Sequence, residues 1–215
     1  MKQTVLQICN HIKDWHKYYV VGKSNELVYK RLIQSSFIGL SPYKNFILLY
    51  GASGVGKTHL ANVWRDKYDA VVVKSISDIN KKKTFLLCED IHMMPGEELF
   101  HIFNIAHESN INCLFTSSVY PYSHHLKDIE SRIRSIMSIE LDRASIDMIQ
   151  KIFISFLNLN NIQYTLPALK SISGRLPNDV SKIKALVEQI HYIVLRDKTI
   201  LNMYVLGYEE IQNLL

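Results

Sequence analysis

One stretch holds the residue types that grip a phosphate group: Gly51-Ala-Ser-Gly-Val-Gly-Lys57-Thr58. A glycine, four further residues and then Gly-Lys-Thr is the spacing of the phosphate-binding P-loop. Glycines let the main chain curl so that successive N–H groups point at one anion, and a helix that begins there adds partial positive charge. Lys57 then reaches the β- and γ-phosphates, and Thr58 holds Mg²⁺. The alternative is a glycine-rich turn that carries Lys-Thr by coincidence.

The flanking residues supply the elements that position such a loop. Phe46–Tyr50 is an apolar run of strand length, and His59–Lys67 repeats its apolar residues at helical spacing. Strand, glycine-rich turn and helix, in that order, form the context that the motif requires. The expected phosphate-binding residues are Gly51, Ser53, Gly54, Val55, Gly56, Lys57, Thr58 and His59.

Acidic and hydroxyl residues follow two other strand-like runs. Glu89 and Asp90 come directly after the apolar run Phe85–Cys88, and Ile111–Phe115 is followed by Thr116-Ser-Ser118. Ligands collect at the carboxyl ends of parallel strands. Two carboxylates beside a P-loop Mg²⁺ make chemical sense because the cation offsets their repulsion. The alternative is a pair of capping acids.

The order of the elements predicts an α/β fold. Five strand-like runs alternate with helical segments, which favours a parallel five-stranded sheet covered on both faces. These runs are Phe46–Tyr50, Ala70–Val73, Phe85–Cys88, Ile111–Phe115 and Ile136–Leu141. The intervening helices are expected at Gly96–Ser109 and Leu126–Arg134, and Glu26–Ile33 precedes the first strand.

After Leu141 the apolar spacing becomes helical throughout. Helices are expected at Ile146–Leu159, Leu166–Ile172, Val180–Leu195 and Tyr208–Leu215. We therefore divide the chain into an N-terminal arm (1–17), a nucleotide-binding domain (18–141) and a small helical domain (142–215).

Composition narrows the classes of protein. The 215 residues are 47% apolar and 21% charged, which is ordinary for a globular chain. No apolar run is long enough to span a bilayer, so we expect a cytoplasmic protein with no membrane partner. The odd number of cysteines fits no metal spacing, and Cys88 and Cys113 are expected to be buried free thiols. The net charge of +5 permits contact with nucleic acid, but a solvated basic surface explains it equally well.

Several segments together resemble DnaA, the family of bacterial replication initiators. Tyr19–Asn25 is similar to its adenine-side motif, and Gly56–Leu60 has the His-Leu that follows its P-loop. Phe100–Glu108 resembles the helix after its second acidic motif, and Thr116–Pro121 is similar to its sensor-1 strand end. DnaA belongs to the AAA+ class, whose αβα parallel sheet and helical lid agree with the pattern above. The resemblance runs from about Tyr18 to the C-terminus.

The resemblance implies roles around the base and the γ-phosphate. Val20, Val21 and Asn25 would line the adenine side. Ser118 stands where sensor 1 would touch the γ-phosphate, although a plain strand-end serine is the alternative. Phe100 is expected in the core rather than as a base-stacking platform.

Two departures from the family pattern predict weak hydrolysis by the chain itself. In the family, the first acid helps to hold Mg²⁺ through water and the second orients the attacking water, so these roles would fall to Glu89 and Asp90. Their side-chain lengths invert the usual order. The sensor-2 arginine of the lid is replaced by Ser181, which cannot make a bidentate phosphate contact.

Ser131-Arg132-Ile133 is similar to the arginine-finger motif of the family. A finger stabilises charge on the γ-phosphate of a neighbouring molecule. Arg132 would therefore act on a partner's ATP. The alternative is a surface arginine on a basic helix that also holds Arg134.

The chain ends where the lid is expected to end, without the helix-turn-helix domain of DnaA. That shape resembles the Hda group of short homologues, which switch the initiator off. Gln3-Thr-Val-Leu6 matches the place of their clamp-binding peptide, with a frayed terminus as the alternative. The resemblance implies bound ADP or ATP with Mg²⁺, association with the DNA-loaded sliding clamp, and hydrolysis of ATP held by DnaA. The resemblance also implies that contact with DNA is indirect or weak. A homodimer is compatible with this resemblance.

Two other functions stay open. One is a DnaA-like or helicase-loader-like protein that binds single-stranded DNA directly. The other is a stand-alone ATPase, against which the order of Glu89 and Asp90 and the serine at position 181 both argue.

Overall fold

The computed structural model describes residues 18–34, 43–79, 82–121 and 126–197. The chain divides into two compact units. Lys23–Arg143 forms one, called here the sheet unit; Met1–Gly22 and Ala144–Leu215 form the other, called the helical unit. Several predicted features lie outside the described residues: Gln3 and Leu6 of the clamp peptide, Cys9, and the helix Tyr208–Leu215.

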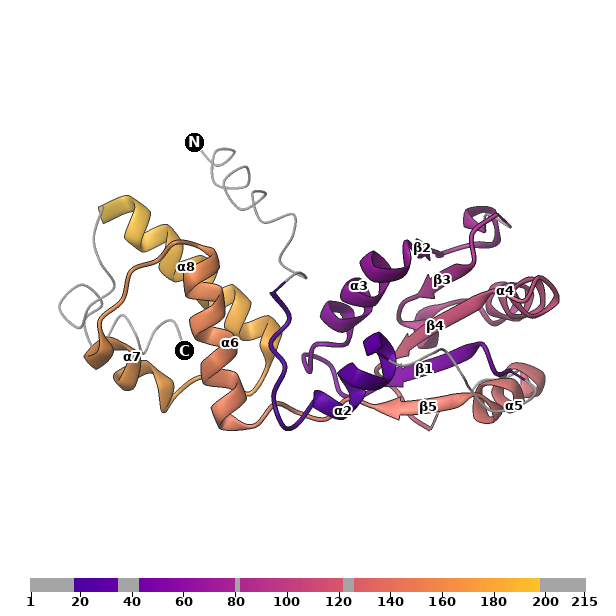
Figure 1. Ribbon diagram of the computed structural model, residues 1–215, viewed down its shortest axis with the longest axis horizontal. Coiled ribbons are helices and arrows are strands. Elements are labelled where there is room, and N and C mark those ends of the chain that lie inside the picture. The colour runs from indigo at the N-terminus through magenta and orange to yellow at the C-terminus, as the bar shows by residue number, and fades with distance from the viewer. Residues whose placement is uncertain (1–17, 35–42, 80–81, 122–125, 198–215) are drawn as a thin grey trace. The chain divides into compact units, whose positions relative to one another are not determined.

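The sheet unit holds five strands in the order β2-β3-β4-β1-β5, and every neighbouring pair is parallel (Figure 1). The strands are β1 (Phe46–Tyr50), β2 (Val71–Val72), β3 (Phe85–Cys88), β4 (Asn112–Ser117) and β5 (Met137–Glu140). The helices are α2 (Glu26–Tyr29), α3 (Lys57–Tyr68), α4 (Gly96–Glu108) and α5 (Lys127–Ser135). Short helical turns are η3 (Lys30–Gln34), η4 (Ile76–Asp78) and η5 (Ile91–Met93). The predicted α/β class with a parallel five-stranded sheet is confirmed.

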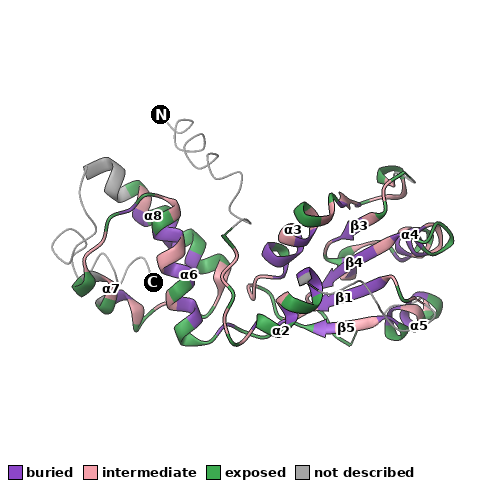
Figure 2. Cartoon of the chain, in the orientation of Figure 1, coloured by how far each residue is buried: buried purple, intermediate pink, exposed green. Residues whose placement is uncertain are grey.

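Helices bury both faces of the sheet, which is why its strands read as continuous apolar runs. Alternate strand residues such as Phe46, Cys88 and Phe115 share a core cluster with Phe103 of α4 and Ile133 of α5. On the opposite pleat, the Phe85 ring meets the buried Trp64 of α3 at a centroid distance of 5.7 Å. Figure 2 shows this burial as purple along the central strands.

The helical unit has its own core. Its helices are α6 (Ile146–Leu159), α7 (Leu166–Ser173) and α8 (Val180–Asp197). Ser145 caps α6, where its hydroxyl accepts a hydrogen bond of 3.3 Å from the main-chain N–H of Met148. Buried residues of α6 and α8, Phe153 and Ile183 among them, form one cluster. Within the described residues, no helix is long and apolar enough to cross a membrane.

Cys88 and Cys113 are free and buried, as predicted. Burial raises the pKa of the Cys88 thiol to about 12, so the group stays protonated at neutral pH. Both thiols therefore act as small apolar core residues.

Candidate nucleotide-binding site

The glycine-rich loop runs from the end of β1 to the start of α3 and is anchored on both sides. The Leu141 N–H donates to the carbonyl of Tyr50 at 2.7 Å, and the Gly51 N–H donates to the carbonyl of Ser117 at 3.3 Å. Gly54 and Gly56 have φ angles of 78° and 102°, which side chains other than glycine rarely adopt. The glycine spacing therefore follows from a main chain that is curled between three strands.

Gly51→Ala is expected to be strongly destabilising. An added Cβ would lie 2.3 Å from the carbonyl oxygen of Leu141, and φ is +155°. We expect the free energy of unfolding to fall by at least about 2 kcal/mol in urea titrations followed by circular dichroism. Gly56→Ala meets no atom within 4 Å but keeps a φ of +102°, so it isolates backbone strain, worth about 1–3 kcal/mol. Gly174→Ala has neither problem. A Gly51→Ala midpoint equal to that of Gly174→Ala would contradict this account of the loop.

Lys57 begins α3 and is buried. Its ammonium group donates to the carbonyl oxygens of Gly51 and Ala52, both at 2.9 Å. Burial lowers the pKa of Lys57, while the nearby Asp90 carboxylate raises it. Because both acceptors are neutral, they leave the positive charge of Lys57 available. The ammonium group lies against the first residues of the loop, on the side where the P-loop motif binds a phosphate.

A cavity of about 430 Å³ opens beside Thr58, between β2, β3 and η5. Its lining residues are Thr58, Val72, Val73, Lys74, Glu89, Asp90, Met93, Met94 and Pro95. One carboxylate oxygen of Glu89 is buried and has no hydrogen-bond partner in the described part of the chain. A buried oxygen without a partner is costly, and Mg²⁺ prefers oxygen ligands. The donor set of Thr58 and Glu89 therefore fits a divalent cation.

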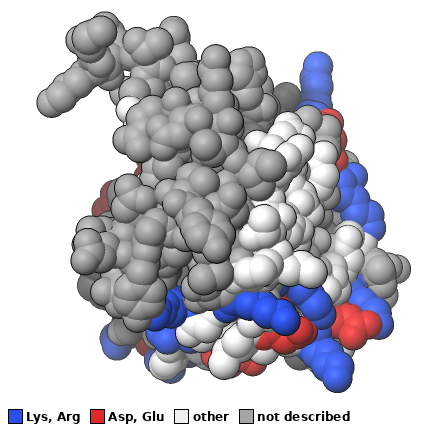
Figure 3. All heavy atoms as spheres, turned by 90° about the vertical axis from the view of Figure 1, so that its left-hand side faces the viewer, with Lys and Arg blue, Asp and Glu red and all other residues white. Residues whose placement is uncertain are grey.

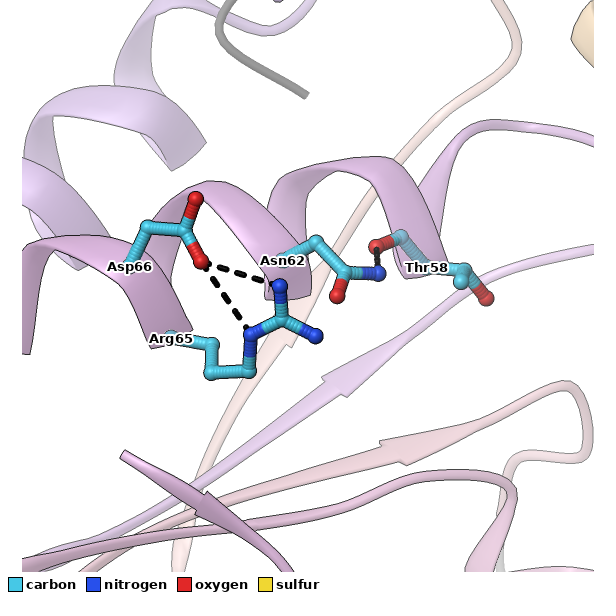
Figure 4. Close-up of polar contacts among 4 residues, drawn as sticks. All are labelled: Thr58, Asn62, Arg65 and Asp66. Carbon is cyan, nitrogen blue, oxygen red and sulfur yellow. Dashed lines mark hydrogen bonds and ion pairs between the residues drawn. The ribbon is translucent and has the colours of Figure 1, made fainter. Parts of the chain in front are cut away.

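On the exposed side of α3, Figure 4 shows polar contacts among Thr58, Asn62, Arg65 and Asp66, whereas the Thr58 side chain hydrogen-bonds the Glu89 carboxylate. Asn62 donates to the main-chain carbonyl of Thr58 at 2.7 Å. Arg65 donates to one carboxylate oxygen of Asp66, at 2.9 Å and 3.2 Å. Neither contact uses the hydroxyl group that a P-loop threonine offers to Mg²⁺.

Glu89→Gln is expected to separate stability from metal binding. Burial raises the pKa of Glu89 above its ordinary value of 4.5, against lowering contributions from Thr58, Arg65 and Lys74. A raised carboxyl pKa means that ionisation costs stability as pH rises above 4.5. Without Mg²⁺, Glu89→Gln should therefore melt above the wild type at pH 7, and the difference should shrink as pH falls towards 4.5.

With Mg²⁺ and ADP the order should reverse, because only the wild type offers an ionised ligand at position 89. Thermal unfolding across this pH range, with and without Mg²⁺, gives the measurement. Equal magnesium-dependent gains in melting temperature for the two proteins would remove Glu89 from the cation site.

At the end of β4 it is Thr116 that contacts the acidic pair, whereas the sequence analysis singled out Ser118 as the functional residue of this strand end. The Asp90 N–H, at a residue with φ of 48°, donates to the hydroxyl oxygen of Thr116 at 2.9 Å. The N–H of Ser118 donates instead to the His92 ring nitrogen at 3.4 Å. Contact of Ser118 with a γ-phosphate stays a prediction. The sequence signal, three successive hydroxyl residues, was present, but the strand pleat decides which one faces Asp90.

The predicted adenine-side residues are divided between the two units. Val20 packs against the core of the helical unit, and Val21 is exposed. Asn25 belongs to the sheet unit, where it is 2% exposed and precedes α2. Ser181 is exposed in the first turn of α8, and its N–H donates to the Asp179 carboxylate at 2.9 Å. The roles of these four residues stay predictions.

Arg132 lies in the last turn of α5, just before β5 begins. The Arg132 Nη1 donates to Oδ1 of Asn104 at 2.5 Å, and its guanidinium carbon lies 4.6 Å from the centroid of the Phe100 ring. Phe100 is half-buried rather than fully in the core. Sequence reasoning missed this contact, because the two helices are separated by a strand in the chain.

Comparison with known proteins places these features in a family context. No family model matches the chain. The chain is 32% identical over 148 residues to the chromosomal replication initiator protein DnaA of Helicobacter hepaticus, a match covering 54% of this chain and 31% of that protein. Across five such DnaA proteins, the chain spans 31% to 53% of the relative's length.

Solved structures show the fold. Domain III of the Thermotoga maritima replication initiation protein DnaA has a TM-score of 0.75 at 17% identity, covering 93% of this chain and 94% of that one. A replication initiator DnaA bound to AMPPCP and single-stranded DNA has a TM-score of 0.64 at 20% identity, covering 85% and 67%. The parallel sheet therefore has the fold of DnaA domain III, and its glycine-rich loop carries the P-loop spacing at the end of β1. In sequence, the chain is similar to DnaA proteins over about half of its own length.

Proposed function

We propose that the sheet unit binds ADP or ATP together with Mg²⁺. The observation that carries this proposal is the curled loop, in which the Lys57 ammonium group donates to the neutral carbonyls of Gly51 and Ala52. The unpartnered oxygen of Glu89 beside Thr58 supports the cation. The DnaA structure bound to AMPPCP, an ATP analogue, has the same fold and adds support from a relative. Gly54, Val55 and Gly56 would contribute main-chain N–H groups to the phosphates.

We further propose that the chain is an Hda-like regulator of replication initiation, which promotes hydrolysis of ATP held by DnaA. Arg132 is the residue that would act. Because β1 and β5 are parallel neighbours, the start of β5 and the end of β1 lie at opposite ends of the strands, so α5 ends far from the chain's own P-loop (Figure 1). Arg132 therefore cannot reach its own γ-phosphate and is available to a neighbouring molecule.

The charges along α5 favour Arg132 over Arg134 as the finger. Arg134 forms an ion pair with the buried carboxylate of Glu130. Arg132 contacts a neutral amide and an aromatic ring, and no carboxylate in the described ranges forms an ion pair with it. Its full positive charge is therefore free to stabilise a developing phosphate charge.

The clamp-binding role rests on the sequence of Gln3 to Leu6, and the weak intrinsic hydrolysis rests on the order of Glu89 and Asp90. Both belong to the proposal. The test measures phosphate release from ATP-loaded DnaA with DNA-loaded clamp, with and without this chain. Faster release only when both chain and clamp are present is the expected result. No acceleration under any combination would overturn the regulatory role.

A direct contact with single-stranded DNA is the second candidate, favoured by the DnaA structure solved with that ligand. The face drawn in Figure 3 shows Lys and Arg side chains beside Asp and Glu side chains among its described residues, rather than one sign alone. A gel shift with the isolated protein that weakens steeply with salt would favour this candidate. Binding that needs the clamp would favour the first.

A further inference from the structure

The surroundings of Arg132 form a small structural unit of their own, built from α4 and α5. Phe100 and Asn104 are four residues apart on α4, so their side chains lie on one side of that helix. The amide oxygen of Asn104 accepts from Nη1 of Arg132 at 2.5 Å, and the Phe100 ring lies under the guanidinium carbon at 4.6 Å. We call these two residues the arginine cradle.

The arginine cradle stands on a fixed support. A second face of α4 is fully buried through Leu99, Ile102 and Phe103. On α5, Ile129 and Ile133 join the same core cluster, so both helices are held by the sheet. An arginine side chain has many rotamers and loses much conformational entropy when it is fixed. A cradle on rigid helices reduces that freedom before any ligand arrives.

Both residues of the arginine cradle are neutral, so neither of them neutralises the positive charge of Arg132. A carboxylate at the place of Asn104 would also hold Arg132, but it would neutralise the charge that a finger must carry. That arrangement exists elsewhere on α5, where Glu130 pairs with Arg134. The cradle instead orients the guanidinium through one hydrogen bond and a cation–π contact, leaving its charge and its other N–H donors for a phosphate.

We propose that Phe100 and Asn104 are positioning residues. They orient the guanidinium group of Arg132 towards the γ-phosphate of ATP bound by a partner, and they do so without neutralising its positive charge. This inference rests on the proposed function. It assigns to α4 a role in the rate of the step rather than in the affinity for the partner.

The test uses Asn104→Asp, a near-isosteric change that converts the neutral contact into an ion pair. We expect the maximal rate of partner ATP turnover to fall by about ten- to a hundredfold, with an unchanged half-saturating concentration. Asn104→Ala and Phe100→Leu should show smaller losses of the same kind. Asn158→Asp makes the same chemical change at an exposed site of α6 and should behave as the wild type. Melting temperatures establish that each variant is folded.

A double-mutant cycle separates positioning from partner contact. Once Arg132 is alanine, Asn104→Asp should have no further effect on the rate. The Nε–H signal of Arg132, observed by nuclear magnetic resonance without any partner, should shift in Asn104→Asp and Asn104→Ala and stay unchanged in Asn158→Asp.

Three results would overturn the inference. Asn104 variants that match the wild type while Arg132→Ala abolishes turnover would leave the proposed function intact but remove the cradle. A raised half-saturating concentration with an unaltered Arg132 signal would assign Asn104 to the partner interface instead. Unchanged turnover in Arg132→Ala would overturn the proposed function and this inference with it.

Discussion

Replacing Arg132 by alanine is expected to lower the turnover of DnaA-bound ATP by about a thousandfold or to the rate without this chain, whichever is higher. The guanidinium group stabilises charge that spreads over the γ-phosphate oxygens in the transition state, and alanine offers no donor there. The measurement is single-turnover phosphate release from ATP-loaded DnaA in the presence of DNA-loaded clamp. Binding of the two proteins should survive, because the effect is on the chemical step.

Arg134→Ala is the matched control, since it removes the same group from the same helical turn. Its ion pair with Glu130 shows that its charge is already compensated, so we expect turnover within about twofold of the wild type. The variant leaves Glu130 without that partner, so it should cost some stability, which a melting curve reveals. Loss of turnover in Arg134→Ala with normal turnover in Arg132→Ala would reverse the assignment of the finger.

Lys57→Ala is expected to weaken ADP and ATP binding by about 10- to 100-fold. An ion-assisted hydrogen bond to phosphate contributes about 1.5–3 kcal/mol, and 1.4 kcal/mol corresponds to a factor of ten. Calorimetric titration with Mg²⁺ present measures the change. Lys57→Met keeps the buried apolar stem while removing the charge, and should show the same loss.

Lys170→Ala, an exposed lysine of α7, controls for the general effect of removing one positive charge. Its affinity for nucleotide should equal that of the wild type. Wild-type affinity in both Lys57 variants, with each protein shown to be folded, would contradict the placement of phosphates at this loop.

Much of the fold could be predicted from the sequence, because the local spacing of apolar residues agrees with where the structure buries them. Phe46–Tyr50 and Phe85–Cys88 are strands with the predicted bounds, since residues buried on both faces must be apolar along their whole length. Ile146–Leu159 is also a helix with the predicted bounds, begun by a capping serine. The helix after the P-loop starts at Lys57, two residues earlier than its apolar spacing indicated, because the polar first turn faces the loop.

Side-chain contacts between distant elements could not be predicted in the same way. The contact between Asp90 and Thr116 depends on the order of the strands in the sheet and on their pleat. Neither can be predicted from the local spacing of apolar residues. The hydrogen bond between Asn104 of the arginine cradle and Arg132 joins residues 28 positions apart, with β4 between them in the chain. The segment Glu26–Ile33, expected as one helix, changes from α-helical to π-helical hydrogen bonding after Tyr29, and nothing in its local spacing announces the change.

Calorimetric titration of the purified protein with ADP in the presence of Mg²⁺ measures whether the glycine-rich loop binds a nucleotide. We expect one-to-one binding together with a rise in melting temperature, both strongly reduced in Lys57→Ala. Absence of heat and an unchanged melting temperature, with ADP and with ATP at millimolar concentrations, would contradict nucleotide binding by this loop.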